Sequence, residues 1–143
     1  MGGEQEVSEL GAELRTAIAR IYRRFRSERA AGELGEAALS VLISLHKQGT
    51  LTLTELSDLD RVTAGSMSQT ITRLATDGLI QRRRDTADGR RMLIELTPEG
   101  ERIAIAARAH QHTWMNARLA EFSDDERAVL REAAALMRRV ADD

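Results

Sequence analysis

Apolar residues recur along this chain at helical spacing in several separate segments. The first stripe falls at steps of three and four residues and consists of Val7, Leu10, Leu14, Ala17, Ile18, Ile21 and Phe25. Such a period places the side chains on one helix face, so we predict a long amphipathic helix over 6–31. A break from Gly32 to Gly35 separates it from a second helix, which is predicted to end at Gly49. The apolar residues of that helix are Leu39, Leu42, Ile43 and Leu45.

Two short helices joined by a turn are predicted next. Thr52 is followed three residues later by Glu55, the capping-box arrangement that opens a helix, and this helix is expected to stop near Asp60. Thr63 can cap a second helix, which Gly78 ends. Its buried stripe consists of Met67, Ile71 and Leu74. Two helices in this order, the second polar on its outer side, are typical of a helix-turn-helix.

A hairpin follows the two helices. An arginine run after Ile80 and the strand-like segment Met92–Leu96 flank a turn at Thr86-Ala87-Asp88-Gly89. Asp-Gly between two strand-like runs is a strong hairpin signal, although this loop is longer than two residues. A helix-turn-helix followed directly by a two-stranded β wing has the order of elements found in a winged helix-turn-helix.

Long helices are predicted after the hairpin. Thr97 caps a helix that has Pro98 at its first position and runs to about Phe122, and a second capping box spans 123–126. The last helix is expected to bury Val129, Leu130, Ala133, Leu136, Met137 and Val140. The predicted fold class is therefore mostly α, a winged helix-turn-helix with amphipathic helices at both chain ends. Those ends are expected to form a dimerisation region across a two-fold axis.

Composition excludes several classes of protein. The 143 residues suit one domain, and the absence of cysteine excludes a disulfide scaffold, a thiolate zinc site and a cysteine nucleophile. No apolar run approaches the roughly 18–20 residues needed to span a bilayer. The first ten residues are acidic and polar, unlike a signal peptide, so we expect a cytoplasmic protein without membrane contact.

Charge is unevenly distributed although its total is small. With 21 basic and 23 acidic residues the chain has a net charge of -2. From Arg82 to Arg91, five arginines face only Asp85 and Asp88, a local charge of +3, so the remainder carries -5. The hairpin is therefore suited to an anionic partner. Arginines also crowd the end of the first helix over 20–29, where a solvated helix end and phosphate contact both stay open as interpretations.

The outer face of the helix after Thr63 is the candidate reading surface. Opposite its buried stripe lie Gly65, Ser66, Ser68, Gln69, Thr72, Arg73 and Thr76. Gln can pair bidentately with adenine and Arg with guanine, while hydroxyl groups suit phosphates or either type of base. The alternative is an ordinary solvated helix face, and the hairpin beside it favours DNA.

The motif spacing resembles that of the MarR family of bacterial transcription regulators over essentially the whole chain. The matching positions are Ser66-Met67, Leu74, Gly78-Leu79-Ile80, Asp88-Gly89-Arg90, Thr97 and Gly100. Gln69 and Ala75 depart from the family pattern, and both lie on the recognition helix. The resemblance implies one MarR-type domain over 1–143, with a winged helix over 34–97 and dimerisation helices over 6–31 and 98–140.

The same resemblance implies a homodimer that binds a palindromic operator in double-stranded DNA. This dimer would repress or activate nearby genes, and repression is favoured here. A small anionic or aromatic ligand would release it, and Tyr22, His46 and Trp114 are the bulky residues that could line its pocket. A tip arginine of the wing would reach the minor groove. The expected DNA contacts are Thr63, Gly65, Ser66, Ser68, Gln69, Thr72, Arg73, Arg82, Arg84, Asp88, Arg90 and Arg91. Asp88 is expected to brace a neighbouring arginine, or to form only a weak surface ion pair.

Other chemistry finds little support in the sequence. His110 and His112 are two residues apart on a helix and point to different sides, so we expect no metal site. No Ser-His-Asp order, glycine-rich phosphate loop or carboxylate pair stands out, so we expect neither enzymatic activity nor a cofactor. The alternative to a DNA-binding regulator is a winged helix used for protein interaction, or a helical dimer without a DNA role.

Overall fold

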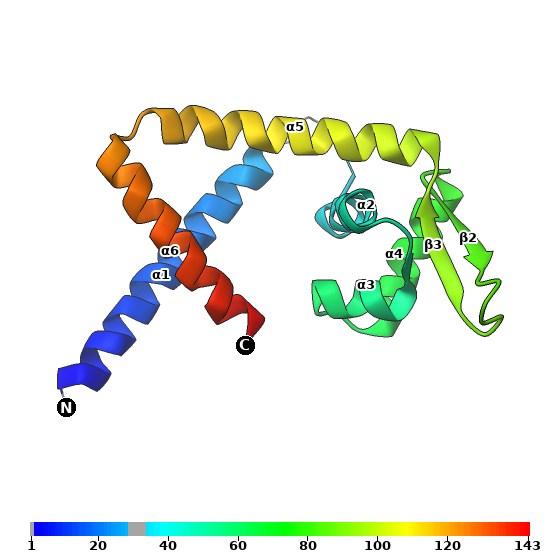
Figure 1. Ribbon diagram of the computed structural model, residues 1–143, viewed down its shortest axis with the longest axis horizontal. Helices are drawn as coiled ribbons and strands as arrows, with labels where there is room; N and C mark the ends of the chain where they lie inside the picture. Colours follow the sequence, from blue (N-terminus) through cyan, green and yellow to red (C-terminus); the bar gives the residue numbers. More distant parts are fainter. Residues whose placement is uncertain (1, 29–33) are drawn as a thin grey trace. The chain divides into compact units, whose positions relative to one another are not determined.

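The computed structural model describes residues 2–28 and 34–143. They form two compact units, one reaching to Ala109 and the other running from His110 to Asp143. The helices and strands, shown in Figure 1, are α1 (Gly2–Ser27), α2 (Glu36–Gln48), β1 (Leu51–Thr52), α3 (Leu53–Asp60), α4 (Ala64–Thr76), β2 (Ile80–Arg84), β3 (Met92–Leu96), α5 (Pro98–Ala120) and α6 (Asp124–Asp142). None of the described helices is long and apolar enough to cross a membrane.

The first helix differs from its predicted bounds. α1 begins at Gly2 rather than at residue 6, because the polar segment before Val7 has no breaking residue and Glu4 favours the positive end of the helix dipole. It ends at Ser27, before the predicted end at residue 31. Residues 29–31 of that prediction, and the predicted break at 32 and 33, lie outside the described residues.

Local capping signals define the short helices as predicted. The Thr52 hydroxyl accepts the backbone N–H of Glu55, whose carboxylate accepts the backbone N–H of Thr52, and this capping box opens α3. Thr63 caps α4 through the backbone N–H of Ser66 at 3.1 Å. Gly78 follows α4 with φ at 74°, a left-handed conformation that glycine adopts without steric cost.

The predicted two-stranded hairpin is confirmed as β2 and β3, and the short strand β1 extends it to a three-stranded sheet. β2 and β3 pair antiparallel, with Arg82 opposite Ile94, and the order of strands is β1-β3-β2. Leu51 of β1 lies opposite Ile94 on the other side of β3. With only two residues, β1 is too short to give an alternating pattern in the sequence, so it was not predicted.

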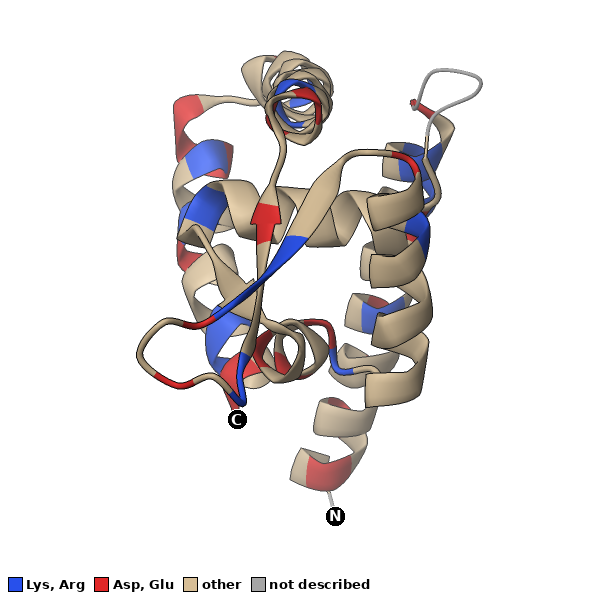
Figure 2. Cartoon of the chain, turned by 90° about the vertical axis from the view of Figure 1, so that its right-hand side faces the viewer, with Lys and Arg blue, Asp and Glu red and all other residues tan. Residues whose placement is uncertain are grey.

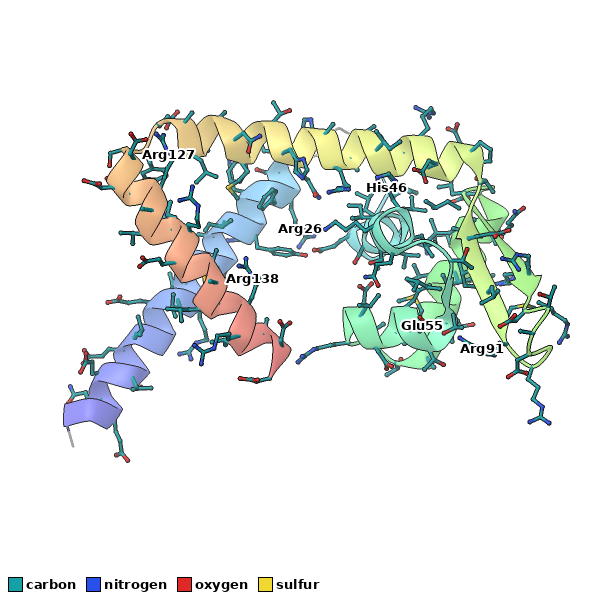
Figure 3. The ribbon with its side chains drawn as sticks, in the orientation of Figure 1. Arg26, His46, Glu55, Arg91, Arg127 and Arg138 are labelled. Carbon is teal, nitrogen blue, oxygen red and sulfur yellow. The ribbon has the colours of Figure 1, made fainter. Side chains whose placement is uncertain are left out.

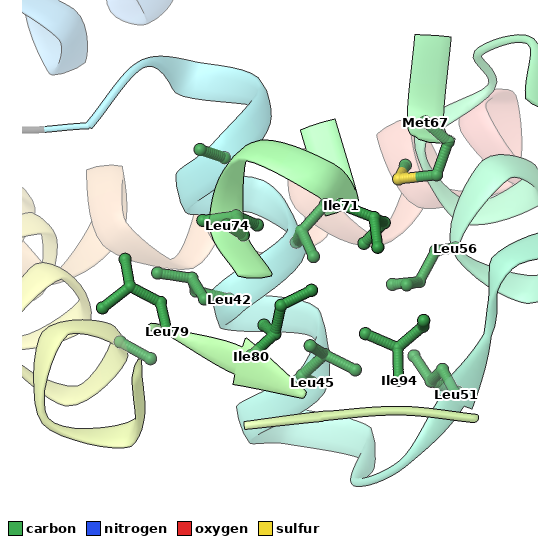
Figure 4. Packing of buried hydrophobic residues seen from close by; sticks show 13 residues of the cluster. Leu42, Leu45, Leu51, Leu56, Met67, Ile71, Leu74, Leu79, Ile80 and Ile94 are labelled. Carbon is green, nitrogen blue, oxygen red and sulfur yellow. The ribbon is translucent and has the colours of Figure 1, made fainter. Parts of the chain in front are cut away.

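One hydrophobic core joins α2, α3, α4 and the sheet (Figure 4). Its most deeply buried large side chains are Val41, Leu42, Leu56, Met67, Ile71, Leu74 and Ile94. Ala104 of α5 belongs to the same cluster and is also fully buried. The start of α5 is therefore part of the winged helix, which fixes α4 and the hairpin against a common support.

The return of the chain from β3 into α5 explains why Thr97 and Gly100 are spaced as they are. The Thr97 backbone N–H donates to the carbonyl oxygen of Leu79 at 3.1 Å, and its hydroxyl donates to the carbonyl of Gly78 at 2.7 Å. The same hydroxyl accepts the backbone N–H of Gly100 at 3.2 Å. Gly100 thereby lies directly against the backbone of Leu79, where a side chain has no room.

The predicted burial of the α6 stripe is wrong for the single chain. No residue of α6 is buried, and Val129 and Val140 are 65% and 81% exposed. Leu130, Leu136 and Met137 are also exposed, and Ala133 is half-buried. A helical stripe shows that one face should be covered, but not whether the same chain covers it. The capping box of Ser123 and Glu126 is confirmed.

Candidate nucleic-acid interface

The two faces of α4 divide as the sequence predicts. Met67, Ile71 and Leu74 are at most 2% exposed, so this side of the helix is held by the core. The residues predicted for the outer face are all exposed: Gly65, Ser66, Ser68, Gln69, Thr72, Arg73 and Thr76. The helix therefore presents a continuous polar surface from a rigid support.

Gln69 and Arg73 are the long polar side chains of that surface. Within the described part of the chain neither side chain has a hydrogen-bond or ion-pair partner, so their donors and acceptors are available to a ligand. Both border a hollow of about 290 Å³ between α4 and the beginning of α2, where Glu36 also lies. The Thr63 side chain is shorter, and its hydroxyl already accepts the backbone N–H of Ser66 as the cap of α4.

Four of the five wing arginines are held by other groups of the protein. Arg82 donates to the Thr72 hydroxyl at 2.9 Å, and Arg84 donates to the carbonyl of Gly89 at 2.9 Å. Arg83 lies 3.3 Å from the Glu95 carboxylate on the neighbouring strand, and Arg91 lies 3.4 Å from that of Glu55. Among the residues that the structure describes, the Arg90 side chain has no such partner and is exposed.

Asp88 acts on the wing in a different way from the prediction. Its carboxylate accepts the backbone N–H of Arg90 at 3.0 Å, and its carbonyl accepts the backbone N–H of Arg91 at 3.0 Å. No arginine side chain pairs with it in the described chain. An aspartate that binds the backbone two residues on is a turn-forming arrangement. Asp88 thus fixes the turn from which Arg90 projects, rather than bracing a guanidinium group.

Two of the arginine contacts connect the wing to the helix-turn-helix. Arg82 of β2 reaches Thr72 on α4, and Arg91, just before β3, reaches Glu55 on α3. Figure 3 shows Glu55 and Arg91 pointing toward one another. Glu55 also forms the α3 capping box, so one carboxylate serves the helix start and the wing together. The sequence places Arg82 and Arg91 in one basic hairpin, but it does not reveal that their side chains contact Thr72 and Glu55.

The charge on the wing is predominantly basic. Figure 2 shows a basic segment along β2 and another at the end of the loop before β3, with acidic segments in the loop and on β3. The contacts made by Arg82, Arg83, Arg84 and Arg91 neutralise only two of these cations, through Glu95 and Glu55. The surface next to α4 therefore retains a positive charge that suits a polyanion.

The three residues considered for an effector site lie on three different helices, α1, α2 and α5. Tyr22 is 44% exposed on α1, and His46 Nδ1 lies 2.5 Å from a Glu101 carboxylate oxygen, which links α2 to α5. Trp114 is half-buried on α5 and belongs to the other compact unit. Across residues 2–28 and 34–143, no three His, Asp or Glu side chains are grouped so that they could hold a metal ion.

The one carboxylate in this region with a shifted pKa lies at the exposed start of α5. A hydrogen bond from the Arg102 guanidinium lowers the pKa of Glu99, and the charge of Arg102 acts in the same direction. Glu99 is fully exposed, so this pair belongs to the helix surface and takes no part in the candidate interface.

Comparison with known proteins decides the family. A sequence model of the MarR family matches residues 34–92, which cover α2 to the first residue of β3. An HTH-type transcriptional regulator of Mycobacterium bovis is 32% identical over 134 residues, which is 94% of this chain and 94% of that protein. The chain belongs to the MarR family. It is a MarR-type transcriptional regulator with a DNA-binding winged helix. The members of this family are DNA-binding regulators rather than enzymes.

Solved structures of MarR proteins agree with this fold. A MarR family protein from Bacillus stearothermophilus superimposes with a TM-score of 0.86 at 25% identity, over 98% of each chain. The PcaV transcriptional regulator of Streptomyces coelicolor, solved in complex with its natural ligand, gives a TM-score of 0.70 at 26% identity, over 92% of this chain and 91% of that one. The MarR resemblance predicted from the sequence is confirmed along almost the full chain.

Proposed function

We propose that this MarR protein is a homodimeric repressor of a palindromic operator in double-stranded DNA. The observation that carries the proposal is the exposed outer face of α4, on which Gln69 and Arg73 have no internal partner, beside a wing from which Arg90 projects. In this assignment residues 34–97 bind DNA, and the segments 6–31 and 98–140, to which α1, α5 and α6 belong, provide the dimer contacts.

Each part of the interface has a distinct role in this proposal. Gln69 and Arg73 read base edges in the major groove, and Arg90 enters the minor groove or meets the backbone beside it. Arg82 and Arg91 hold Thr72 and Glu55, and each guanidinium has further N–H groups for phosphates. The remaining phosphate contacts are assigned to Thr63, Gly65, Ser66, Ser68, Thr72 and Arg84. Asp88 contributes to the DNA-binding surface by positioning the turn that carries Arg90.

The dimer follows from apolar surface that the chain leaves uncovered. Val7, Leu10 and Ile21 on α1 are 71%, 54% and 48% exposed, and the α6 stripe is exposed as well. Contiguous apolar helix faces of this kind mark association surfaces, and a two-fold axis is the commonest way to cover them. A two-fold dimer would also present two winged helices, which a palindromic site requires.

A small anionic or aromatic ligand is proposed to release the protein from DNA. The support is the PcaV structure, which holds its natural ligand in a related fold. Tyr22, His46 and Trp114 are the candidate ligand residues in this chain. Because the chain has no cysteine, a ligand rather than thiol oxidation is the proposed signal.

The alternative is a winged helix that binds protein, or a helical dimer without a DNA role. A protein-binding wing has no need of five arginines in ten residues, which favours DNA. A gel shift with fragments of genomic DNA at moderate salt separates the two. Retention of some fragments in the presence of excess nonspecific DNA supports the proposal, and the absence of any shifted fragment contradicts it.

We expect the intact protein to be a dimer at micromolar concentration and a variant without α1 to be monomeric. Removing α1 takes away one of the two exposed apolar stripes, while the core of α2, α3, α4 and the sheet contains no α1 residue. Light scattering gives the mass of each species, and circular dichroism shows whether the shortened chain is folded. An intact protein that scatters as a monomer would refute the dimer.

A further inference from the structure

The Glu55 side chain lies where the start of α3 meets the wing. Its carboxylate oxygen Oε1 accepts the backbone N–H of Thr52 at 3.3 Å and the Thr52 hydroxyl at 3.0 Å, which holds it in the capping box. The Arg91 guanidinium lies 3.4 Å from the same oxygen. A capping box accepts glutamine as well as glutamate at this position, so the cap alone does not require a negative charge here.

The backbone of Arg91 is also held in place. Its N–H donates to the carbonyl of Asp88 at 3.0 Å, and its carbonyl accepts the N–H of Asp85 at 3.0 Å. These two hydrogen bonds fix Arg91 at the end of the wing loop. The ion pair therefore connects two anchored residues, and their side chains point toward one another (Figure 3).

The pair lies at the surface, where it is accessible to a large ligand. The Arg91 side chain is 52% exposed and that of Glu55 is 48% exposed. Arg91 directly follows Arg90, which projects from the wing without an internal partner among the described residues. A carboxylate this close to a guanidinium cancels much of its attraction for a third charge, and it repels a phosphate itself.

We propose that Glu55 limits the affinity of the wing for DNA by compensating the charge of Arg91, and this rests on the proposed DNA-binding function. A DNA backbone bound at Arg90 passes close to its neighbour Arg91. Contacts to phosphates position the protein but carry no sequence information. Glu55 therefore weakens binding to duplex DNA of every sequence and leaves the reading of bases by α4 unchanged.

A second ion pair on the wing provides a matched comparison. The Arg83 guanidinium lies 3.3 Å from the Glu95 carboxylate, which also accepts the Gln81 amide at 2.7 Å. Arg83 is not among the residues assigned to DNA. Glu95→Gln removes the same formal charge from the wing as Glu55→Gln, so it measures the effect of net charge alone.

Fluorescence anisotropy with a labelled duplex of random sequence measures the effect of Glu55 over a salt titration. Glu55→Gln, which preserves the capping box, should bind about tenfold more tightly than the wild type at moderate salt. Its slope of log affinity against log salt should steepen by about 1 per wing, or about 2 per dimer, because each uncompensated Arg91 binds a phosphate. Glu95→Gln should stay close to the wild type. Thermal unfolding shows whether each variant is folded.

A second background separates compensation of Arg91 from a general effect of charge. In an Arg91→Ala protein, Glu55→Gln should change the affinity by no more than Glu95→Gln changes that of the wild type. An equal gain from Glu55→Gln with and without Arg91 would overturn the inference. An equal gain from Glu95→Gln in the wild type would overturn it as well.

The remaining outcomes distinguish this inference from the proposed function. A folded Glu55→Gln protein that binds the duplex like the wild type, or more weakly, would show that Glu55 does not limit DNA binding. That result would overturn the inference and leave the DNA-binding function intact. Failure of the wild type and of every variant to bind any duplex would refute both.

Discussion

Gly100→Ala is expected to reduce the free energy of unfolding by about 3 kcal/mol or more, enough to leave the winged helix barely stable. A Cβ at this position would lie 1.9 Å from the carbonyl oxygen of Leu79 and 2.9 Å from its carbonyl carbon. These are backbone atoms, and the same oxygen accepts the Thr97 N–H. The clash can therefore be relieved only by moving the start of α5 away from the backbone of Leu79, which connects α4 to β2.

Urea unfolding followed by circular dichroism measures this effect. Gly89→Ala is the matched control, because a Cβ there would meet no atom within 4 Å and the residue has no left-handed backbone conformation. The control should unfold at nearly the wild-type urea concentration. If Gly100→Ala unfolded at the same concentration as Gly89→Ala, the close approach of α5 to Leu79 would be wrong.

Arg90→Ala is expected to weaken binding to many DNA sequences, whereas Gln69→Ala and Arg73→Ala should relax the choice of sequence. Arg90 projects from the wing without an internal partner, so its loss removes a backbone or minor-groove contact and leaves the fold unchanged. If it neutralises a phosphate, the slope of log affinity against log salt should fall by about 1 per contact, or about 2 for a dimer. The α4 variants should lose roughly 1–3 kcal/mol of discrimination at particular base pairs.

Arg83→Ala is the matched control for the wing. Its guanidinium pairs with Glu95, and removing it takes away the same formal charge as Arg90→Ala. Binding constants are measured by fluorescence anisotropy over a salt titration, with thermal unfolding to show that each variant is folded. An Arg90→Ala protein that binds like the wild type at every salt concentration would show that the wing does not contact DNA.

Features with local causes were predictable from the sequence. The capping boxes at Thr52 and Ser123 and the buried stripe of α4 depend on neighbouring residues, and the structure has them as predicted. β1 was missed because two residues give no pattern, and its pairing with Ile94 joins segments far apart in the chain. The prediction of an amphipathic helix is correct for α6, but the burial of its apolar stripe depends on more than this single chain.

The candidate interface was predictable in its location but not in its contacts. The exposed face of α4 follows from helical period alone. The partners of Arg82 and Arg91 depend on folding, since Glu55 is 36 residues before Arg91 in sequence. Helical and strand patterns give no information on such long-range side-chain contacts. The turn-forming role of Asp88 could have been found from its position one residue before Gly89, because aspartate commonly binds the backbone two residues on.

Selection of bound sequences from random duplex DNA tests the central claim most directly. The full-length protein is incubated with the pool at moderate salt, and the retained fragments are sequenced after several rounds. A two-fold dimer that reads DNA through α4 predicts an enriched palindrome whose half-sites are about one helical turn, roughly 10 base pairs, apart. Enrichment of no sequence, or retention of no DNA at all, would contradict it.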